Sequence, residues 1–280
     1  MRDRQAVFSG VFLLLLWLEC WAVPAIAWAT IHPARRGEAF TFAVKMLGSV
    51  EAGRARLAIL PVQFSKQGPI VQVRGESEAV GMAKSLTGWQ QKYTLLLDGN
   101  TLLPRRIEQT DQGRIPRQAT FVVTGRHFQM TVQKPDAQWQ TGGTLRADLL
   151  DPVSVLLLLR GLRLQDGDTI KLFVTGGTAL YRAELRVVGR EKIQTTDGSR
   201  RAIHLSGRGE RINERDEVIG KTPWLGELWL SDDTLRLPLV TKTETVLGTA
   251  EFSLTSHDIG AQTLSVPRNA PAFLVIPKPK

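Results

Sequence analysis

The side chains that could carry chemistry are scattered along this chain. His32, His127, His204 and His257 lie far apart and share no spacing typical of metal ligands. The sequence contains no Gly-x-Ser-x-Gly turn, no nucleophile–base pair and no cluster of carboxylates. We therefore expect a protein that is not an enzyme and that uses no metal and no cofactor. An enzyme whose catalytic groups meet only in space is the weakest of the alternatives.

The adjacent carboxylates Asp232 and Asp233 could in principle act together as acid and base. Neighbouring residues of a strand point to opposite faces, which keeps such a pair apart. Aspartate often begins turns, because its side chain hydrogen-bonds the backbone just ahead of it. The sequence therefore predicts a structural turn at Asp232 and Asp233, between two strands.

A second polar motif belongs to a helix that we predict at about residues 151–161. Asp151 is suited to the N-cap, and Pro152 to the first helical position, where no amide donor is needed. The hydroxyl of Ser154, in the first turn, is expected to satisfy a helix-end group rather than to attack a substrate. Arg160 lies near the C-terminal end, where the helix dipole favours a cation. Gly161 can end the helix.

The middle of this helix, residues 155–159, is apolar on nearly every side. Such a helix should be enclosed, most simply by a curved sheet. We expect Leu156, Leu157 and Leu159 to line any cavity between the helix and the sheet.

Most of the remaining chain alternates apolar and polar residues with the period of half-buried strands, as at Phe40, Phe42 and Val44. Turn signals such as Gly176-Gly177 separate the strands and indicate antiparallel hairpins. The predicted fold is mainly β: a large curved antiparallel sheet or open β-barrel enclosing one short buried helix. Residues 37–259 form a single β-rich domain. Residues 260–280 form a proline-rich tail that docks as an edge strand or stays mobile.

The first 29 residues have the order of a secretory signal peptide. Arg2 and Arg4 precede an apolar run that is too short to span a bilayer comfortably, and small residues follow up to Ala29. A retained anchor and a lipoprotein modified at Cys20 are the alternatives. Cys20 is the single cysteine, so a cleaved chain has no thiol and no disulfide. We expect a periplasmic protein.

The net charge of +9 bears on the partners. An exported basic protein meets anionic lipid head groups rather than nucleic acid, and a weak peripheral attraction to an anionic membrane surface follows. The basic residues form short clusters only, and no polybasic binding tract is present.

Four segments give the chain a family resemblance: the early strand 37–44, the segment 52–55 after a glycine-containing turn, the helix motif 151–160, and the late strand and turn 229–238. In this order they resemble exported bacterial proteins with the DUF3108 domain of unknown function. The resemblance implies export and a β-rich architecture, and it implies no activity. Family members often carry aromatics in the helix where this chain has leucines, which implies a more aliphatic pocket. A looser likeness is to the periplasmic lipoprotein-carrier fold, an open antiparallel barrel around a helix.

Two functions fit these features. The first is binding of a hydrophobic small molecule, such as a lipid or an acyl chain, in a concave β cavity. The second is an envelope interaction or structural module with a filled core and a protein partner, which docks on sheet edges or on the tail.

Overall fold

The computed structural model describes residues 35–46, 48, 50–66, 68–114, 116–144, 146, 148–220, 223–245, 248–259, 262–263 and 274–276. The predicted signal peptide and Cys20 lie outside these residues, as does most of the tail. Neither helix of the described part has the length and apolar character needed to cross a membrane.

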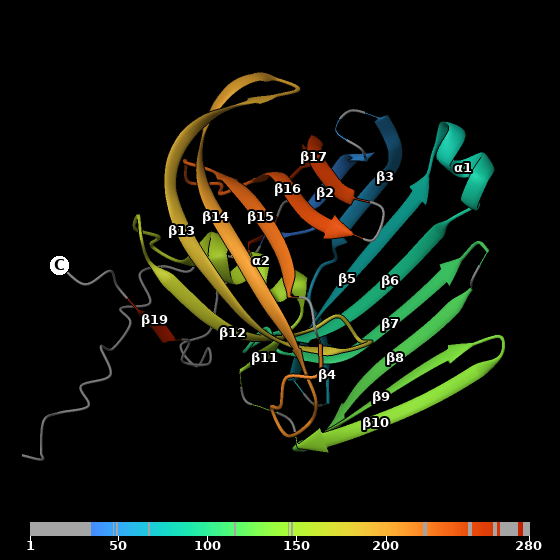
Figure 1. Ribbon diagram of the computed structural model, residues 1–280. Coiled ribbons are helices and arrows are strands. Elements are labelled where there is room, and N and C mark those ends of the chain that lie inside the picture. Colours follow the sequence, from blue (N-terminus) through green and yellow to red (C-terminus); the bar gives the residue numbers. More distant parts are fainter. Residues whose placement is uncertain are drawn as a thin grey trace, which may run out of the picture.

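Strands make up most of the described chain, and two helices interrupt them (Figure 1). The helices are α1 (Gly81–Thr87) and α2 (Pro152–Gly161). The strands are β1 (Arg35–Arg36), β2 (Ala39–Met46), β3 (Val50–Ile59), β4 (Gln63–Ser65), β5 (Gly68–Ala79), β6 (Gln90–Asp98), β7 (Pro104–Gln112), β8 (Arg117–Thr124), β9 (His127–Lys134), β10 (Ala137–Thr144), β11 (Leu149–Leu150), β12 (Thr169–Thr175), β13 (Leu180–Thr195), β14 (Gly198–Ile212), β15 (Trp224–Ser231), β16 (Pro238–Thr245), β17 (Gly248–Asp258), β18 (Gln262–Thr263) and β19 (Leu274–Ile276).

One large antiparallel sheet contains nearly all of these strands. Its hydrogen-bonded order is β10-β9-β8-β7-β6-β5-β3-β2-β17-β16-β15-β14-β13-β12. Most neighbours are consecutive hairpins, and the pairing of β17 with β2 joins the two halves of the chain. The short strands β11 and β19 pair with β12, and β4 pairs with β5.

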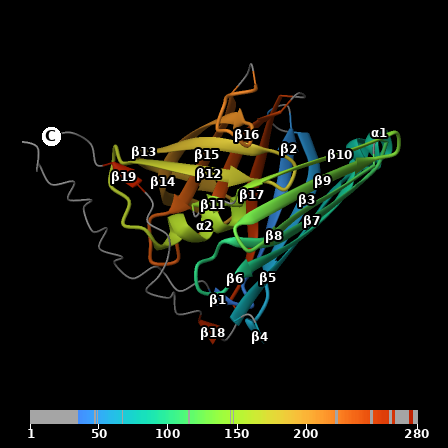
Figure 2. The ribbon, with the colours of Figure 1, turned by 90° about the horizontal axis from the view of Figure 1, so that it is seen from below.

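The sheet curves around α2 without closing. Within the described residues no hydrogen-bonded register joins β10 to β11, so β10 and β12 are the two edges of the main sheet. Figures 1 and 2 show α2 between the two halves of the curved sheet. The predicted fold class, a curved antiparallel sheet around a short helix, is therefore confirmed.

Helix α2 connects the two parts of the hydrophobic core. Val153 and Leu157 pack in a cluster with side chains from both halves of the sheet, such as Leu95 of β6 and Trp229 of β15. Leu158 and Leu159 pack in a second cluster, with apolar side chains of β12, β14 and β15. An all-round apolar helix can be buried in this way because sheet strands cover it from both sides.

Helix α1 is absent from the sequence-based prediction. It occupies the connection between β5 and β6, where a tight turn would suffice. Its N-cap residue, Val80, makes no side-chain cap hydrogen bond, and the helix ends at Gly88 in the left-handed conformation. Its seven residues hold no buried side chain, so neither an N-cap residue nor a buried face marks it.

The hairpin β13–β14 extends beyond the stretch in which apolar and polar residues alternate. Beyond a register shift between Val187 and Gly189 it continues to a turn at residues 195–198. This outer part, which we call the arm, returns to the sheet: Thr196 Oγ1 donates to the Leu254 carbonyl (3.3 Å), and Trp229 Nε1 donates to Glu191 Oε1 (2.5 Å).

Candidate functional site

The N-terminus of α2 is held by buried polar groups. Asp151 Oδ1 accepts from the amides of Val153 (2.8 Å) and Ser154 (3.3 Å). Ser154 Oγ lies within hydrogen-bonding reach of the Asp151 carboxylate and 2.7 Å from the Leu102 carbonyl oxygen. Tyr93 Oη of β6 lies 3.5 Å from Asp151 Oδ1. The predicted cap residues therefore also tie the helix to the β6–β7 turn.

The ionisation of Asp151 is unusual for a helix cap. Burial raises the pKa of its carboxyl to about 6, although the Ser154 hydroxyl and two backbone amides partly offset that effect. Burial, with the neighbouring Asp151 charge, also raises the pKa of Tyr93 well above its ordinary value. Asp151 can thus take up a proton inside the core at mildly acidic pH.

The C-terminal end of α2 is held by an ion pair. Arg160 Nη1 and Nη2 donate to Glu38 Oε2 (2.9 Å) and Oε1 (2.7 Å), and Arg160 Nη2 also donates to the Leu235 carbonyl (3.2 Å). His257 Nε2 lies 2.7 Å from Glu38 Oε1. Burial raises the pKa of Glu38, but the hydrogen bonds and charges of Arg160 and His257 outweigh it and leave that pKa below its ordinary value.

Arg160 is the point where three of the family-like segments meet. Glu38 comes from the first segment, Arg160 from the second and Leu235 from the third. Sequence reasoning missed the pairing of Glu38 with His257, because 219 positions separate them. The available signal was a charged residue within an otherwise apolar setting, since buried charges need partners.

The three leucines proposed as cavity-lining residues lie in or beside the core. Leu157 and Leu159 are buried, Leu157 in the cluster with Phe40 and Leu159 in the cluster with β14. Leu156 is partly buried against the second cluster. Neither of the two surface grooves described below is lined by them.

An apolar surface continues beyond α2 on the same face of the sheet, here called the inner face. Phe40, Leu57, Gly75 and Tyr93 lie opposite one another on four successive strands. Phe40 is fully buried, whereas Leu57 and Tyr93 are half-buried. A Cβ on Gly75 would lie 3.4 Å from Tyr93 Cβ and 3.8 Å from a Leu57 methyl, so the glycine leaves a shallow space between two apolar side chains.

The half-buried apolar residues extend to the neighbouring strands. Phe42, Val44 and Phe252 of β2 and β17 share the inner face and are each half-buried. Farther along the inner face, Asp111 accepts from Gln91 Nε2 (2.8 Å), Gln109 Nε2 (2.9 Å) and Arg117 Nε (2.8 Å). The inner face therefore changes from a packed apolar base to a half-buried apolar zone and then to a polar cluster.

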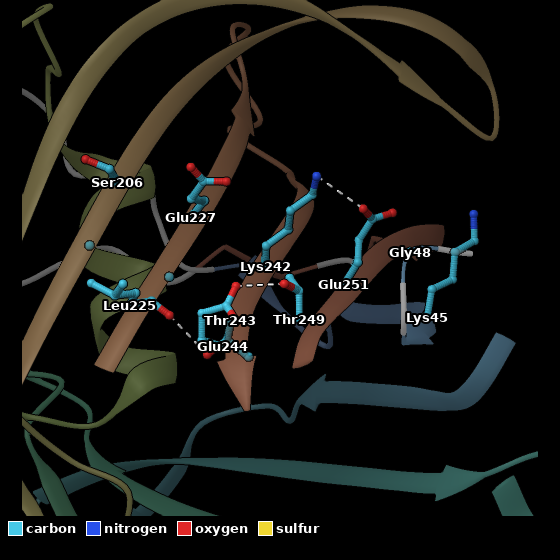
Figure 3. Close-up of a pocket in the computed structure, with 12 residues that line it drawn as sticks. Lys45, Gly48, Ser206, Leu225, Glu227, Lys242, Thr243, Glu244, Thr249 and Glu251 are labelled. Carbon is cyan, nitrogen blue, oxygen red and sulfur yellow. Dashed lines mark hydrogen bonds and ion pairs between the residues drawn. The ribbon is translucent and has the colours of Figure 1, made fainter. Parts of the chain in front are cut away.

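A groove of about 620 Å³ lies on the opposite face, over β14 to β17 and β2 (Figure 3). Its floor includes one row of residues that are paired across five strands: Ser206, Glu227, Lys242, Glu251 and Lys45. Lys242 Nζ lies 3.4 Å from Glu251 Oε2. Because the charges alternate in sign, they largely compensate one another and select no single class of ligand.

A second groove, of about 580 Å³, lies at the β9–β10 edge and includes His127, Gln140 and Gly143. No group of three or more metal-ligating side chains occurs among the described residues.

Asp232 and Asp233 have separate structural roles. Asp233 Oδ1 accepts from the amides of Leu235 (2.8 Å) and Arg236 (3.1 Å) and orders the turn. Asp232 instead pairs with Arg201 (3.0 Å) and Arg190 (3.4 Å) of the arm. The structure thus places these carboxylates in a turn and in an ion-pair network that fastens the arm.

Comparison with curated protein sequences returned no match. Among solved structures, the chain is similar to a β-barrel-like protein of the domain of unknown function DUF1849 from Brucella abortus, with 8% identity, a TM-score of 0.48, and coverage of 81% of this chain and 99% of the other. It is also similar to a protein with a YmcC-like fold from Bacteroides fragilis, with 10% identity, a TM-score of 0.36, and coverage of 82% and 99%.

The comparison with protein families matches residues 41–255, which include nearly all of the main sheet and the whole of α2. The chain therefore belongs to the family described as protein of unknown function DUF3108.

Proposed function

We propose that this protein is exported to the cell envelope and holds a hydrophobic molecule, such as a lipid acyl chain, against the inner face of its sheet. The binding zone begins where the packing around α2 ends. It consists of the half-buried residues Phe42, Leu57, Tyr93 and Phe252, with Gly75 between two of them.

The row Leu57–Gly75–Tyr93 is the observation that carries the proposal. Apolar side chains on a curved sheet are normally covered by other parts of the chain, and exposed apolar surface often marks a binding site. Here the covering is incomplete, and the absence of a side chain at Gly75 leaves room beside two apolar groups. An acyl chain would complete the burial of this strip, and each buried methylene would contribute about 0.8 kcal/mol.

Export is part of the same proposal. It is supported by the basic, apolar and small-residue order of the first 29 residues, which is typical of a signal peptide.

An interaction module with a filled core is the second candidate. The packing of Leu157 and Leu159 favours it, because the sheet already covers both of these side chains. In this alternative, the inner-face strip would receive a partner's apolar side chains.

A matched pair of substitutions on β3 tests the binding zone. Ala55 is half-buried on the inner face, opposite Phe42, whereas Ala58 of the same strand lies on the other face. We expect Ala55→Glu to weaken binding of a dansyl-labelled fatty acid about tenfold or more, because the acyl chain would have to pack against a charge. Ala58→Glu should bind like the wild type.

The purified protein is titrated with the probe, and organic extracts of the same preparations are examined by mass spectrometry. A lipid that copurifies with the wild type and with Ala58→Glu, but not with Ala55→Glu, would support the carrier function. Equal binding by both variants, with circular dichroism showing intact folds, would exclude the inner-face zone. Absence of both probe binding and copurifying lipid would favour the interaction module.

A further inference from the structure

Three apolar side chains stand exposed at the end of the sheet where β5 passes into β6. Met82 and Leu86 of α1 are 77% and 57% exposed, and Trp89, just after the helix, is 39% exposed. We call these three residues the α1 tip. Val50, at the start of the neighbouring β3, is also exposed. Figure 1 shows α1 at the margin of the curved sheet, away from α2.

The helix holds its apolar side outward. Met82 and Leu86 are four positions apart and so share one face of α1, while Ala83 is the half-buried residue of the helix. The base of the helix is fixed by two backbone bonds, from Val80 N to the Ala52 carbonyl (3.0 Å) and from Ala79 N to the Trp89 carbonyl (2.9 Å).

The β7–β8 turn supports the other end of α1. A Cβ on Gly113 would lie 2.9 Å from the Thr87 carbonyl oxygen and 3.2 Å from Trp89 Cα, so the turn packs directly against the chain that follows the helix. The apolar residues of the α1 tip are therefore presented by an anchored element. Because α1 buries none of its side chains, it contributes little to the core, and its exposed apolar side chains are available for contacts outside the protein.

The charges near the α1 tip are mixed, with exposed basic groups beside the apolar residues. Lys84 lies between Met82 and Leu86 in the sequence and is exposed, and Arg114 follows Gly113 in the supporting turn and is also exposed. The exposed acidic groups at this end include Glu78 and Glu51, and Glu51 has Arg54 at 3.8 Å. Asp111, next to the supporting turn, is buried against Arg117. The whole chain carries +9.

We propose that the α1 tip docks on the surface of an anionic lipid bilayer. Met82, Leu86 and Trp89 enter the interfacial region, and Lys84 and Arg114 lie at the level of the anionic head groups. Apolar groups that insert and basic groups that remain at the surface are the combination that peripheral membrane binding requires. A protein partner would be expected to cover Met82 and Leu86 without a need for excess positive charge.

The position of α1 gives the docking a consequence for the inner face. Gly75 and Ser77 of β5 lead along the inner face toward α1, and both are half-buried, whereas Val73 before them and Ala79 after them are buried. A docked protein would have this half-buried stretch of the inner face near the bilayer. Docking does not require a bound ligand, so the two proposals are tested separately.

The experiment is sedimentation of the purified protein with vesicles of phosphatidylcholine containing phosphatidylglycerol, and with vesicles of phosphatidylcholine alone. We expect binding to the mixed vesicles that weakens as salt screens the charges. The double variant Met82→Ser/Leu86→Ser should bind the mixed vesicles at least about tenfold more weakly than the wild type. Phe64→Ser is the matched control, because Phe64 is 80% exposed on β4 and lies outside the α1 tip.

Fluorescence quenching by brominated lipid adds a readout of depth. The part of the quenching that disappears in Trp89→Phe reports insertion of the α1 tip. Loss of binding in the double variant, retained binding in Phe64→Ser and quenching that depends on Trp89 would together support the proposal. Equal binding by the double variant and the wild type would overturn it, as would no wild-type binding at low salt. Self-association that requires Met82 and Leu86, without vesicle binding, would assign the surface to a second copy of the chain instead.

Discussion

At the scale of single residues, the buried carboxylates at the two ends of α2 have pKa values that are shifted in opposite directions. Asp151 is a buried carboxylate whose only compensation comes from hydrogen bonds, and burial raises its pKa to about 6. Glu38 is equally buried but faces Arg160 and His257, and its pKa lies below the ordinary value. The same type of group is therefore expected to respond to acid in opposite directions at the two ends of one helix.

The first prediction concerns Asp151→Asn. Between about pH 4 and pH 6 the folded protein keeps the proton on Asp151 while the unfolded chain releases it. The free energy of unfolding contributed by this group therefore falls as the pH rises through that range, by up to about 3 kcal/mol. Asparagine can still accept from the amides of Val153 and Ser154 but does not titrate. Urea unfolding at pH 4.5, 5.5 and 6.5 should show this slope in the wild type and its loss in the variant. Parallel curves for the two proteins would contradict the assignment.

The second prediction concerns Glu38→Gln. The substitution leaves Arg160 buried without its carboxylate partner, which costs about 3–5 kcal/mol for buried pairs. Since the pKa of Glu38 is lowered, its contribution is complete above about pH 4.5 and is lost as the pH falls through its folded value. Urea unfolding at pH 7 should show a large loss of stability, and the gap to the wild type should narrow in acid.

Glu51→Gln is the matched control for this second prediction, because Glu51 pairs with Arg54 on the surface. Exposed ion pairs contribute about 0–1 kcal/mol, so this variant should unfold almost like the wild type. Equal effects of the two substitutions would show that the Glu38–Arg160 pair does not hold the helix in place.

At the scale of elements, the parts that could be predicted from sequence are those whose local signals agree with their tertiary setting. Asp151 and Pro152 mark the start of α2, Gly161 lies at its end, and alternation marks strands that have one covered face. Helix α1 lacks these signals, since it has no side-chain cap and no buried face. The arm gives no alternation signal, because most of residues 189–201 are polar on both faces. The Glu38–Arg160 pair spans 122 positions, a separation that no local pattern encodes.

Tryptophan placement shows the same limit. Large aromatics are expected in the core, and Trp229 is buried there, but Trp89, Trp139 and Trp224 each remain about two-fifths exposed. How much of each tryptophan is covered depends on the curvature of the sheet and on the position of its edges, and the residue type specifies neither.

The third prediction separates a packed α2 from a cavity-lining one. Leu157 is 3% exposed and touches the larger core cluster, whereas Leu156 is only half-buried. Leu157→Ala should therefore cost about 2–5 kcal/mol, the range for a buried leucine, and Leu156→Ala clearly less. Thermal and urea unfolding of both variants provide the measurement. A small, similar loss in both would mean that Leu157 borders open space, as the sequence-based hypothesis of a helix-lined cavity requires.

At the scale of the whole molecule, an open sheet has to protect its edges. Unpaired backbone groups at an edge can recruit another strand and cause association. On the outer side of β12, β11 pairs with Phe173 and Val174, and β19 pairs with residues 169–171. The proline-rich tail thus supplies β19 to an edge that would otherwise be open in that stretch.

The fourth prediction tests this protection by deletion of residues 267–280. Loss of β19 exposes the backbone of Thr169, Ile170 and Lys171, so the shortened protein should self-associate with rising concentration while the main sheet stays folded. A shorter deletion, of residues 278–280, leaves β19 in place and should behave like the full chain. Analytical ultracentrifugation over a concentration series measures the difference, and circular dichroism reports the fold. If both shortened proteins remain monomeric, the edge of β12 does not need β19 for protection. The exposed edge would then have shown no tendency to pair, which argues against a partner that adds a strand beside β12.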